Sequence, residues 1–233
     1  MKALLVDLDD TLLDYSGGVE DSWGQACADV AAPVGVDPVV LAAAIVRSRR
    51  WFWDDPDRHR TARVDMMGAW TRIAEHALTS VGSANDPLAA RIAECFADLR
   101  WRRMGLFPGV HDALAAWHAR GIPMALVTNG DRRQQRRKIE QHDLARYFDV
   151  MVIEGEFGCG KPDEKVYRHA LAALAARPED AWMVGDHIEW DVGAPQRLGV
   201  RGVWVDAPGA GLPNTCAVVP HQIIRAFTEW TGE

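Results

Sequence analysis

The stretch "VDLDDTL" at Val6–Leu12 decides the fold, because it marks where a buried strand ends and a polar loop begins. The residues before it, "KALLVD" at 2–7, form a short apolar run without helical period, which predicts a strand buried on both faces. Three carboxylates then follow within four positions, at Asp7, Asp9 and Asp10. Like charges this close repel each other, so the cluster requires either a compensating cation or a solvated loop.

Apolar runs of the same kind recur along the chain, at Pro123–Thr128, Val150–Ile153, Ala181–Gly185 and Val200–Val205. Stretches with helical spacing lie between the runs, at Val110–Ala119, Asp131–His142, Asp163–Ala176 and Gly193–Leu198. Strands that alternate with helices predict a parallel sheet with right-handed crossovers. The predicted fold class is therefore α/β, with a doubly wound parallel sheet.

The interval of about residues 14–106 breaks this alternation, because it contains no strand-like run and its apolar residues recur at helical spacing. Four prolines divide it into about four helices, at Pro33, Pro38, Pro56 and Pro87. The sequence therefore predicts two domains. An α/β core comprises residues 1–14 and 107–233, and residues 15–106 form an inserted, all-helical domain.

The net charge of the chain limits the kinds of partner that it is expected to bind. The 233-residue chain carries 26 Lys and Arg against 33 Asp and Glu, a formal net charge of −7. Nucleic acid polymers and membrane surfaces usually bind a basic face, so we expect neither as a partner. The chain has no apolar stretch of about 18 residues that would span a bilayer. The sequence makes no prediction about the oligomeric state.

Two further features predict the location. The apolar run at the start of the chain ends before Asp7 and is too short for a signal peptide. Four cysteines are widely spaced, without CxxC pairs or metal-ligand spacing, at Cys27, Cys95, Cys159 and Cys216. We interpret them as reduced thiols and expect a cytoplasmic protein.

Polar side chains follow the predicted strands at their carboxyl ends, where ligands bind in open parallel sheets. Thr128, Asn129 and Gly130 follow the second strand, Asp186 and Asp191 follow the fourth, and Lys161 precedes a helix.

These residue types suit phosphate chemistry. Carboxylates at Asp7 and Asp186, on adjacent strand ends, would form an oxygen-rich pocket of the kind that Mg²⁺ prefers. That cation and Lys161 would offset the charge that otherwise repels an anionic substrate. The Thr128 hydroxyl and the backbone N–H groups of Asn129 and the following glycine would hold phosphate oxygens.

The order of these residues resembles the four motifs of the haloacid dehalogenase-like hydrolase superfamily. Its first motif, DxDxT, appears as Asp7–Thr11, and its second, a Ser or Thr that ends a strand, as Thr128. Its third is a Lys before a helix, here Lys161, and its fourth, GDxxxxD, appears as Gly185–Asp191. The helical insertion has the position of that superfamily's cap. The DLDDTL form of the first motif looks like that of nucleotidases and acylneuraminate phosphatases.

This resemblance implies a Rossmann-like core and a Mg²⁺-dependent phosphatase. Asp7 would be the nucleophile that forms an aspartyl-phosphate, and Asp9 would protonate the leaving alkoxide and then activate water. Mg²⁺ would be held by the Asp7 carboxylate, the Asp9 backbone carbonyl and Asp186, with Asp191 in support. Thr128 and Lys161 would bind the transferring phosphoryl group. The substrate would be a small phosphorylated metabolite, such as a sugar phosphate, a nucleotide or a phosphoglycolate-like acid.

Three alternatives are open at this point. A 2-haloacid dehalogenase is one, although enzymes of this superfamily that displace halide from carbon characteristically lack an acid at the position of Asp9. A nucleotide-dependent kinase or NTPase is another, because Gly155–Lys161 fits GxxxxGK, but Pro162 stands where that motif needs a hydroxyl. A non-catalytic protein that binds phosphorylated metabolites is the third, and such a protein has no evident need for the complete set of polar residues.

The segment Arg47–Arg63 of the insertion combines arginines with three aromatic residues. One interpretation is that it binds an anionic group and a ring of the substrate. The other is that its aromatic residues pack the helical bundle and its arginines are solvated or paired with nearby aspartates.

Overall fold

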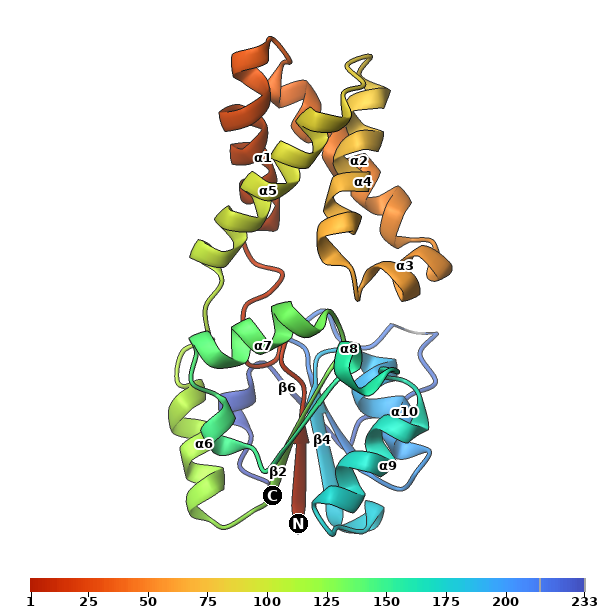
Figure 1. The fold of residues 1–233 in the computed structure, drawn as a ribbon. Coiled ribbons are helices and arrows are strands. Elements are labelled where there is room, and N and C mark those ends of the chain that lie inside the picture. Colours follow the sequence, from red (N-terminus) through yellow and green to blue (C-terminus); the bar gives the residue numbers. More distant parts are fainter. Residues whose placement is uncertain (214, 233) are drawn as a thin grey trace. The chain divides into compact units, whose positions relative to one another are not determined.

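The computed structural model describes residues 1–213 and 215–232. The chain forms two compact units (Figure 1). The first comprises Met1–Tyr15 together with the described residues from Gly105 onward, and the second comprises Ser16–Met104. Among the described residues, no helix is both long and apolar enough to cross a membrane.

The first unit contains a six-stranded sheet in the order β3-β2-β1-β4-β5-β6, and every pair of neighbouring strands is parallel. The strands are β1 (Ala3–Val6), β2 (Met124–Thr128), β3 (Val150–Ile153), β4 (Ala181–Gly185), β5 (Arg201–Val205) and β6 (Gln222–Ile224). The α/β class with a parallel sheet and a helical insertion is thus confirmed. Strand β6 was not predicted, because it has only three residues and Ile223 is half exposed.

Helices cover both faces of this sheet. Figure 1 shows α6 on one side and α9 and α10 on the other. The helical segments of the unit are α6 (Val110–Ala119), α7 (Arg132–Gln141), η3 (Ala145–Tyr147), α8 (Glu154–Phe157), α9 (Glu164–Ala173), η4 (Pro178–Asp180), η5 (Ile188–Gly193), α10 (Ala194–Gln196) and η6 (Phe227–Glu229). On the α9 side, Tyr167 and Leu171 pack with Leu5, Val127 and Met183 in one buried apolar cluster.

The helix predicted from Gly193 begins earlier than expected. A π-helical turn, η5, covers Ile188–Gly193 and continues directly into α10. This turn includes three of the four residues between the two aspartates of the fourth motif.

The strand order places the site. The chain winds from β1 to β2 and β3 on one side, and returns to β4, β5 and β6 on the other. In such sheets the crevice for a ligand opens at the carboxyl ends of the two strands where the winding reverses, here β1 and β4. Val6 pairs with Val184 in the sheet register, and the Asp7 N–H donates to the Val184 carbonyl at 3.0 Å. Asp7 and Asp186 therefore leave adjacent strands at the same edge.

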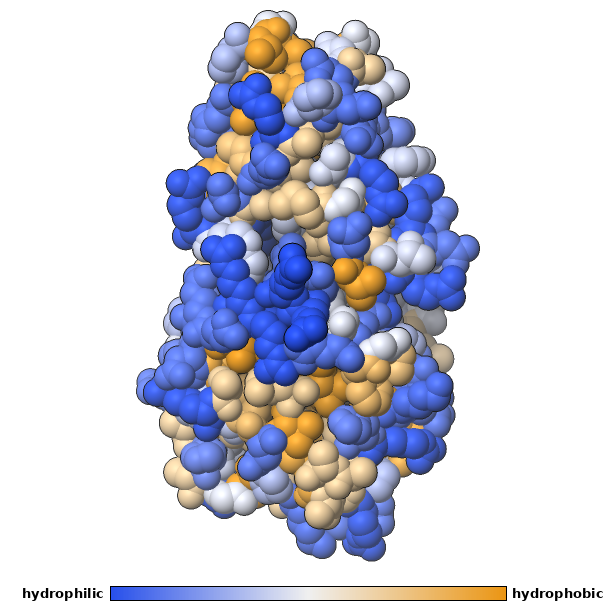
Figure 2. Space-filling model, in the orientation of Figure 1, coloured by the Kyte–Doolittle hydropathy of each residue, from blue (hydrophilic) through white to orange (hydrophobic). Residues whose placement is uncertain are grey.

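Helix α7 is amphipathic in an unusual way, because its buried side is partly polar. Arg132, Arg133 and Arg137 are exposed, and Figure 2 shows a strongly hydrophilic patch over this helix. Gln135 and Lys138 are buried instead, each about 2% exposed. The sequence predicted a helix here but not these two inward polar residues.

The second unit is helical throughout its described regular structure. Its helices are α1 (Val19–Ala26), η1 (Cys27–Ala31), η2 (Ala32–Val34), α2 (Pro38–Trp53), α3 (Pro56–Ala62), α4 (Met66–Ser80) and α5 (Asp86–Arg103). Side chains of Asp37, Asp55, Asp65 and Asn85 cap four of them by accepting backbone N–H groups. The five α-helices exceed the expected four or so, since α3 is a short helix of seven residues.

Aromatic residues hold this helical unit together. The rings of Trp23 and Phe96 stack with centroids 3.8 Å apart, and Trp70 meets Phe96 edge-on at 5.2 Å. In the segment Arg47–Arg63, Phe52 is buried. Trp51 is 44% exposed and contacts His76 and Arg58. Arginines of the segment pair with neighbouring aspartates, as in Arg60 with Asp57. These contacts fit the packing interpretation for most of the segment.

We predict that Phe96→Ala destabilises the helical unit by about 3–5 kcal/mol, because it removes a large buried ring and leaves a cavity. The measurement is urea unfolding followed by circular dichroism. Val39→Ala is the matched control, since Val39 is 77% exposed on α2, and it should change the free energy of unfolding by no more than about 0.5 kcal/mol. Equal effects of the two substitutions would contradict the stacked core.

Candidate active site

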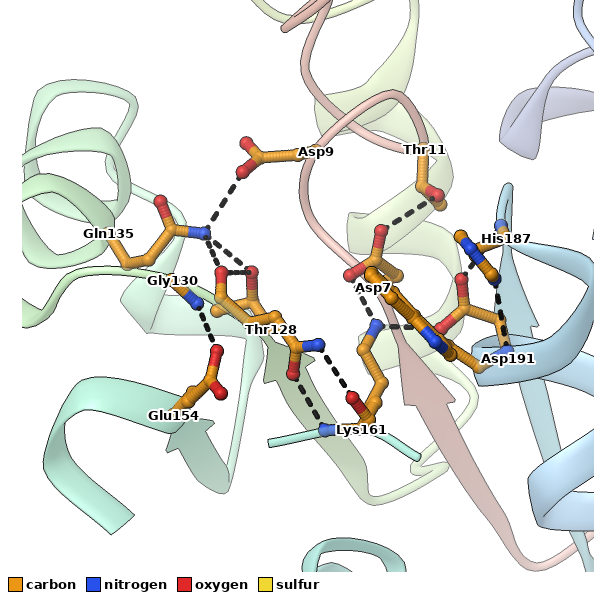
Figure 3. A network of polar contacts seen from close by, with 12 residues as sticks. Asp7, Asp9, Thr11, Thr128, Gly130, Gln135, Glu154, Lys161, His187 and Asp191 are labelled. Carbon is orange, nitrogen blue, oxygen red and sulfur yellow. Dashed lines mark hydrogen bonds and ion pairs between the residues drawn. The ribbon is translucent and has the colours of Figure 1, made fainter. Parts of the chain in front are cut away.

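A buried lysine joins two loops at the carboxyl edge of the sheet. Lys161 Nζ lies 2.6 Å from Asp7 Oδ1 and 2.6 Å from Asp191 Oδ1, and Lys161 is 2% exposed (Figure 3). Asp7 follows β1, and Asp191 lies in η5 after β4. The lysine itself comes from the segment between α8 and α9. Three loops that are far apart in the sequence therefore meet at one ammonium group.

The position of Asp191 explains why the fourth motif begins with a glycine, Gly185. A Cβ atom on Gly185 would lie 2.3 Å from Asp191 Cγ, so only glycine lets the Asp191 carboxylate approach the end of β4. Asp191 Oδ2 then accepts the backbone N–H of His187 at 3.0 Å. Both carboxylate oxygens of Asp191 are thus engaged, which fixes its orientation toward Lys161.

Burial and neighbouring charges shift the pKa values of the ionisable groups in this cluster. Burial, more than any neighbouring charge, raises the pKa of Asp7 to about 7, with Lys161 opposing and Asp191 adding to the rise. Burial also raises the pKa of Asp186 to about 9, and the charges of Asp7 and Asp191 add to it. Burial opposes the charge on Lys161, but the carboxylates of Asp191 and Asp7 outweigh it and raise the pKa of the lysine.

A divalent cation fits this site. Carboxylate oxygens of Asp7, Asp186 and Asp191 all lie within 4.8 Å of one another. Mg²⁺ binds carboxylate oxygens and retains water and phosphate ligands. One lysine cannot balance three carboxylates. The pKa values of Asp7 and Asp186 are raised mainly by burial, and the charges of the neighbouring carboxylates raise them further. The donor set and the charge both match the cation that the sequence predicted.

Hydrogen bonds to the Lys161 backbone and to Glu154 hold the loop after β2 in place. The Asn129 side chain accepts the Lys161 backbone N–H at 2.7 Å and donates to the Lys161 carbonyl at 2.8 Å, so it ties this loop to the lysine. The backbone N–H of Gly130, expected as a phosphate donor, instead donates to Glu154 Oε2 at 3.0 Å. That expectation was wrong because the buried Glu154 carboxylate lies behind the loop. The Asn129 backbone N–H as a phosphate donor stays a prediction.

Asp9 turns away from the other carboxylates. Its two oxygens lie 2.8 and 2.7 Å from Lys138 Nζ, and Oδ2 accepts a hydrogen bond from Gln135 Nε2 at 3.1 Å. Gln135 Nε2 also donates to Thr128 Oγ1 at 2.6 Å. Figure 3 shows Asp9 directed toward Gln135, while Asp7, Lys161 and Asp191 meet on the other side. Sequence reasoning missed both α7 residues, because their i, i+3 spacing places them on one helix face but does not show that this face is buried.

The GxxxxGK segment does not form a phosphate-binding loop. Its first residues belong to the short helix α8. Gly155 packs against the backbone of α7, where a Cβ atom would lie 2.6 Å from the Arg132 nitrogen. Lys161 points to carboxylates rather than into a cradle of backbone N–H groups. The structure therefore gives no support to the kinase or NTPase alternative.

Comparison with known proteins agrees with this geometry. Residues 1–199 match the family described as haloacid dehalogenase-like hydrolase. The phosphoserine phosphatase of Thermus thermophilus is 37% identical over 226 residues, which cover 88% of this chain and 89% of that protein. The N-acylneuraminate-9-phosphatase of Rattus norvegicus is 32% identical over 152 residues, which cover 65% of this chain and 60% of that protein.

Solved structures show the same fold. The putative HAD-hydrolase YfnB of Bacillus subtilis, bound to magnesium, has a TM-score of 0.75 at 19% identity, covering 98% of this chain and 96% of that one. A 2-haloacid dehalogenase of Pseudomonas syringae has a TM-score of 0.67 at 26% identity, with coverage of 98% and 96%.

The chain belongs to the haloacid dehalogenase-like hydrolase family, and its helical insertion after β1 is the family's cap. Within that family it is a phosphatase, a hydrolase that acts on phosphoric monoesters.

We predict that the free energy of unfolding of the metal-free protein falls as pH rises from about 6 to about 9. In the unfolded chain both carboxyls lose their protons near pH 3.8, whereas in the folded protein Asp7 and Asp186 keep them to about 7 and 9. The folded state therefore binds more protons over this range, and raising the pH favours unfolding. Urea unfolding in the presence of EDTA measures the slope.

Asp186→Asn is the control for this prediction, because it removes the group with the higher pKa and should flatten the decline. An unchanged slope in that variant, or a wild-type stability that rises with pH, would contradict the raised pKa values.

Proposed function

We propose that this protein is a Mg²⁺-dependent phosphatase that hydrolyses a small phosphorylated metabolite through an aspartyl-phosphate on Asp7. The observation that carries the proposal is Lys161, held between Asp7 and Asp191 at 2.6 Å from each, with Asp186 in the same carboxylate group. A nucleophile beside a fixed cation, at the switch point of a parallel sheet, suits an anionic substrate.

In the first step, a carboxylate oxygen of Asp7 attacks phosphorus and the bond to the ester oxygen breaks. Asp9 in its protonated form gives its proton to the leaving oxygen, so the metabolite departs with a hydroxyl group rather than an alkoxide. Lys161 balances part of the negative charge that spreads over the phosphoryl oxygens, and the Thr128 hydroxyl donates to one of them.

In the second step, water attacks the phosphorus of the aspartyl-phosphate. Asp9, now ionised, accepts the proton of that water, and the Asp7 carboxylate leaves. Inorganic phosphate is released and Asp7 is restored, so one carboxyl serves as acid and then as base.

The residues that would hold Mg²⁺ are the carboxylates of Asp7 and Asp186 and the backbone carbonyl of Asp9. When bound, the ion supplies positive charge that offsets the carboxylates and the phosphoryl group. Asp191 acts in support, because its two oxygens already accept from Lys161 and from the His187 N–H.

The substrate class rests on the relatives. Two of them are by name phosphatases of phosphoserine and of an N-acylneuraminate 9-phosphate, and a third, from Methanopyrus kandleri, is a glyceraldehyde 3-phosphate phosphatase. All three names describe small phosphorylated metabolites with further polar groups. We expect the substrate of this chain in the same class, and the cytoplasmic location stays a prediction.

We predict that Asp7→Asn lowers phosphate release from a panel of phosphate monoesters by at least about 10³-fold, because the covalent route is lost. Wild-type turnover should require Mg²⁺ and stop in EDTA. Acid quenching followed by peptide mass spectrometry should find the phosphoryl group on Asp7.

The matched control is Asp10→Asn, which removes a carboxylate from the same loop. Asp10 has a φ of 58°, a backbone conformation that Asn also accepts, and this variant should keep its turnover. Mg²⁺-dependent activity in Asp7→Asn, or an adduct on another residue, would refute the mechanism.

Dehalogenation is the second candidate, because one structural relative carries that name. Asp9 separates the two reactions, since only an alkoxide leaving group needs a proton. Asp9→Asn should lower the hydrolysis of alkyl phosphates by about 10²–10⁴-fold, and that of 4-nitrophenyl phosphate far less, because nitrophenolate leaves without protonation. Halide release from 2-chloropropionate by the wild type, or an equal loss for both esters, would contradict the assignment of Asp9.

A further inference from the structure

Lys138 is a buried cation that the two-step reaction does not use directly. Its side chain is 2% exposed, and Nζ contacts both oxygens of Asp9 at 2.8 and 2.7 Å. The ring of Tyr15 lies 4.1 Å from the same Nζ atom, so the ammonium is covered on another side. Burying a lysine is costly unless its partner is well placed. The other basic residues of α7 are exposed or half-buried, which makes this inward lysine an exception that requires an explanation.

Gln135 lies one helical turn earlier on the same face. Its Nε2 group has two hydrogens and three acceptors within reach: Thr128 Oγ1 at 2.6 Å, the Asn129 carbonyl at 2.9 Å and Asp9 Oδ2 at 3.1 Å. A carbonyl and a carboxylate can only accept, so the amide must present its nitrogen to this group rather than its oxygen. The side chain is therefore oriented by its partners, and it touches both Asp9 and Thr128.

The hydrogen bond to Thr128 has a direct consequence. When Thr128 Oγ1 accepts from Gln135, its own hydrogen is left to donate elsewhere. In this structure it donates to the Asn129 carbonyl at 3.3 Å, a long contact that a phosphoryl oxygen would replace. Gln135 thus presents the Thr128 hydroxyl as a donor, which is the role required toward a transferring phosphoryl group.

We propose that Gln135 and Lys138 are positioning residues, which hold the Asp9 carboxylate and the Thr128 hydroxyl in the geometry that the reaction needs. This inference rests on the proposed function. Lys138 contacts both oxygens of Asp9 and so restricts rotation about the carboxyl group, while Gln135 links Asp9 to the phosphoryl-binding loop. Because both residues lie on α7, the helix sets the distance between the acid-base group and the phosphate donor.

The test is Lys138→Met, which keeps the length of the side chain and removes its charge and donors. We expect kcat for an alkyl phosphate to fall by about 10–100-fold, with KM changed less than about 3-fold, because placement of the acid is lost and substrate binding is kept. The rate with 4-nitrophenyl phosphate should fall less than about 5-fold, since its leaving group needs no proton.

A double-mutant cycle separates positioning from general stability. If Lys138 acts through Asp9, then adding Lys138→Met to Asp9→Asn should change the rate by less than about 2-fold. Arg133→Met is the control, because it removes one positive charge from an exposed site on the same helix, and it should leave kcat unchanged.

Gln135→Leu provides a second variant that keeps the test available if Lys138→Met does not fold. It removes the donor to Thr128 and should raise KM as well as lower kcat, because the phosphoryl-binding hydroxyl is no longer oriented. Equal losses with alkyl and aryl esters in Lys138→Met, or full additivity with Asp9→Asn, would overturn the inference. If the wild type releases phosphate and Lys138→Met releases it at the same rate, only this inference is overturned. If the wild type is inactive, the proposed function itself is refuted.

Discussion

The structure of this site depends on one ammonium group, Lys161 Nζ, and its two contacts of 2.6 Å to Asp7 and Asp191. These three groups come from different loops, and each is almost completely buried. A buried charge is tolerated only with a partner, so these contacts tie the positions of the three loops to one another. The same requirement explains why Gly185 is a glycine, since any larger residue would displace Asp191.

A second polar network joins this centre to α7. Asn129 forms hydrogen bonds with the backbone of Lys161 on both its N–H and its carbonyl, and Gln135 contacts the Asn129 carbonyl and Thr128. Preorganised groups of this kind stabilise charge in a transition state without rearrangement during the reaction. The network leaves the Asp7 side of the site rich in negative charge, which is the condition under which a divalent cation binds.

The sequence predicted much of this architecture for clear physical reasons. Strands buried on both faces leave uninterrupted apolar runs, and the run before Asp7 became β1, the strand at which the winding reverses. The helix expected at Val110–Ala119 has those bounds in the structure. Strand β6 was missed because an edge strand of three residues with a half-exposed Ile223 leaves no apolar run. The GxxxxGK pattern suggested a phosphate-binding loop, yet its glycines serve close packing against α7 and the loop after β2.

What the sequence determined by itself was the chemistry available at each strand end, because side-chain type and the order of motifs are properties of the chain. Asp7, Thr128, Lys161 and Asp186 could be identified in this way. Only the tertiary structure decided which groups meet. It paired Lys161 with two carboxylates, gave the Gly130 N–H to Glu154, and turned Lys138 inward to Asp9 among arginines that face outward. These outcomes depend on distances between residues far apart in the chain, and local patterns of polarity carry no record of such distances.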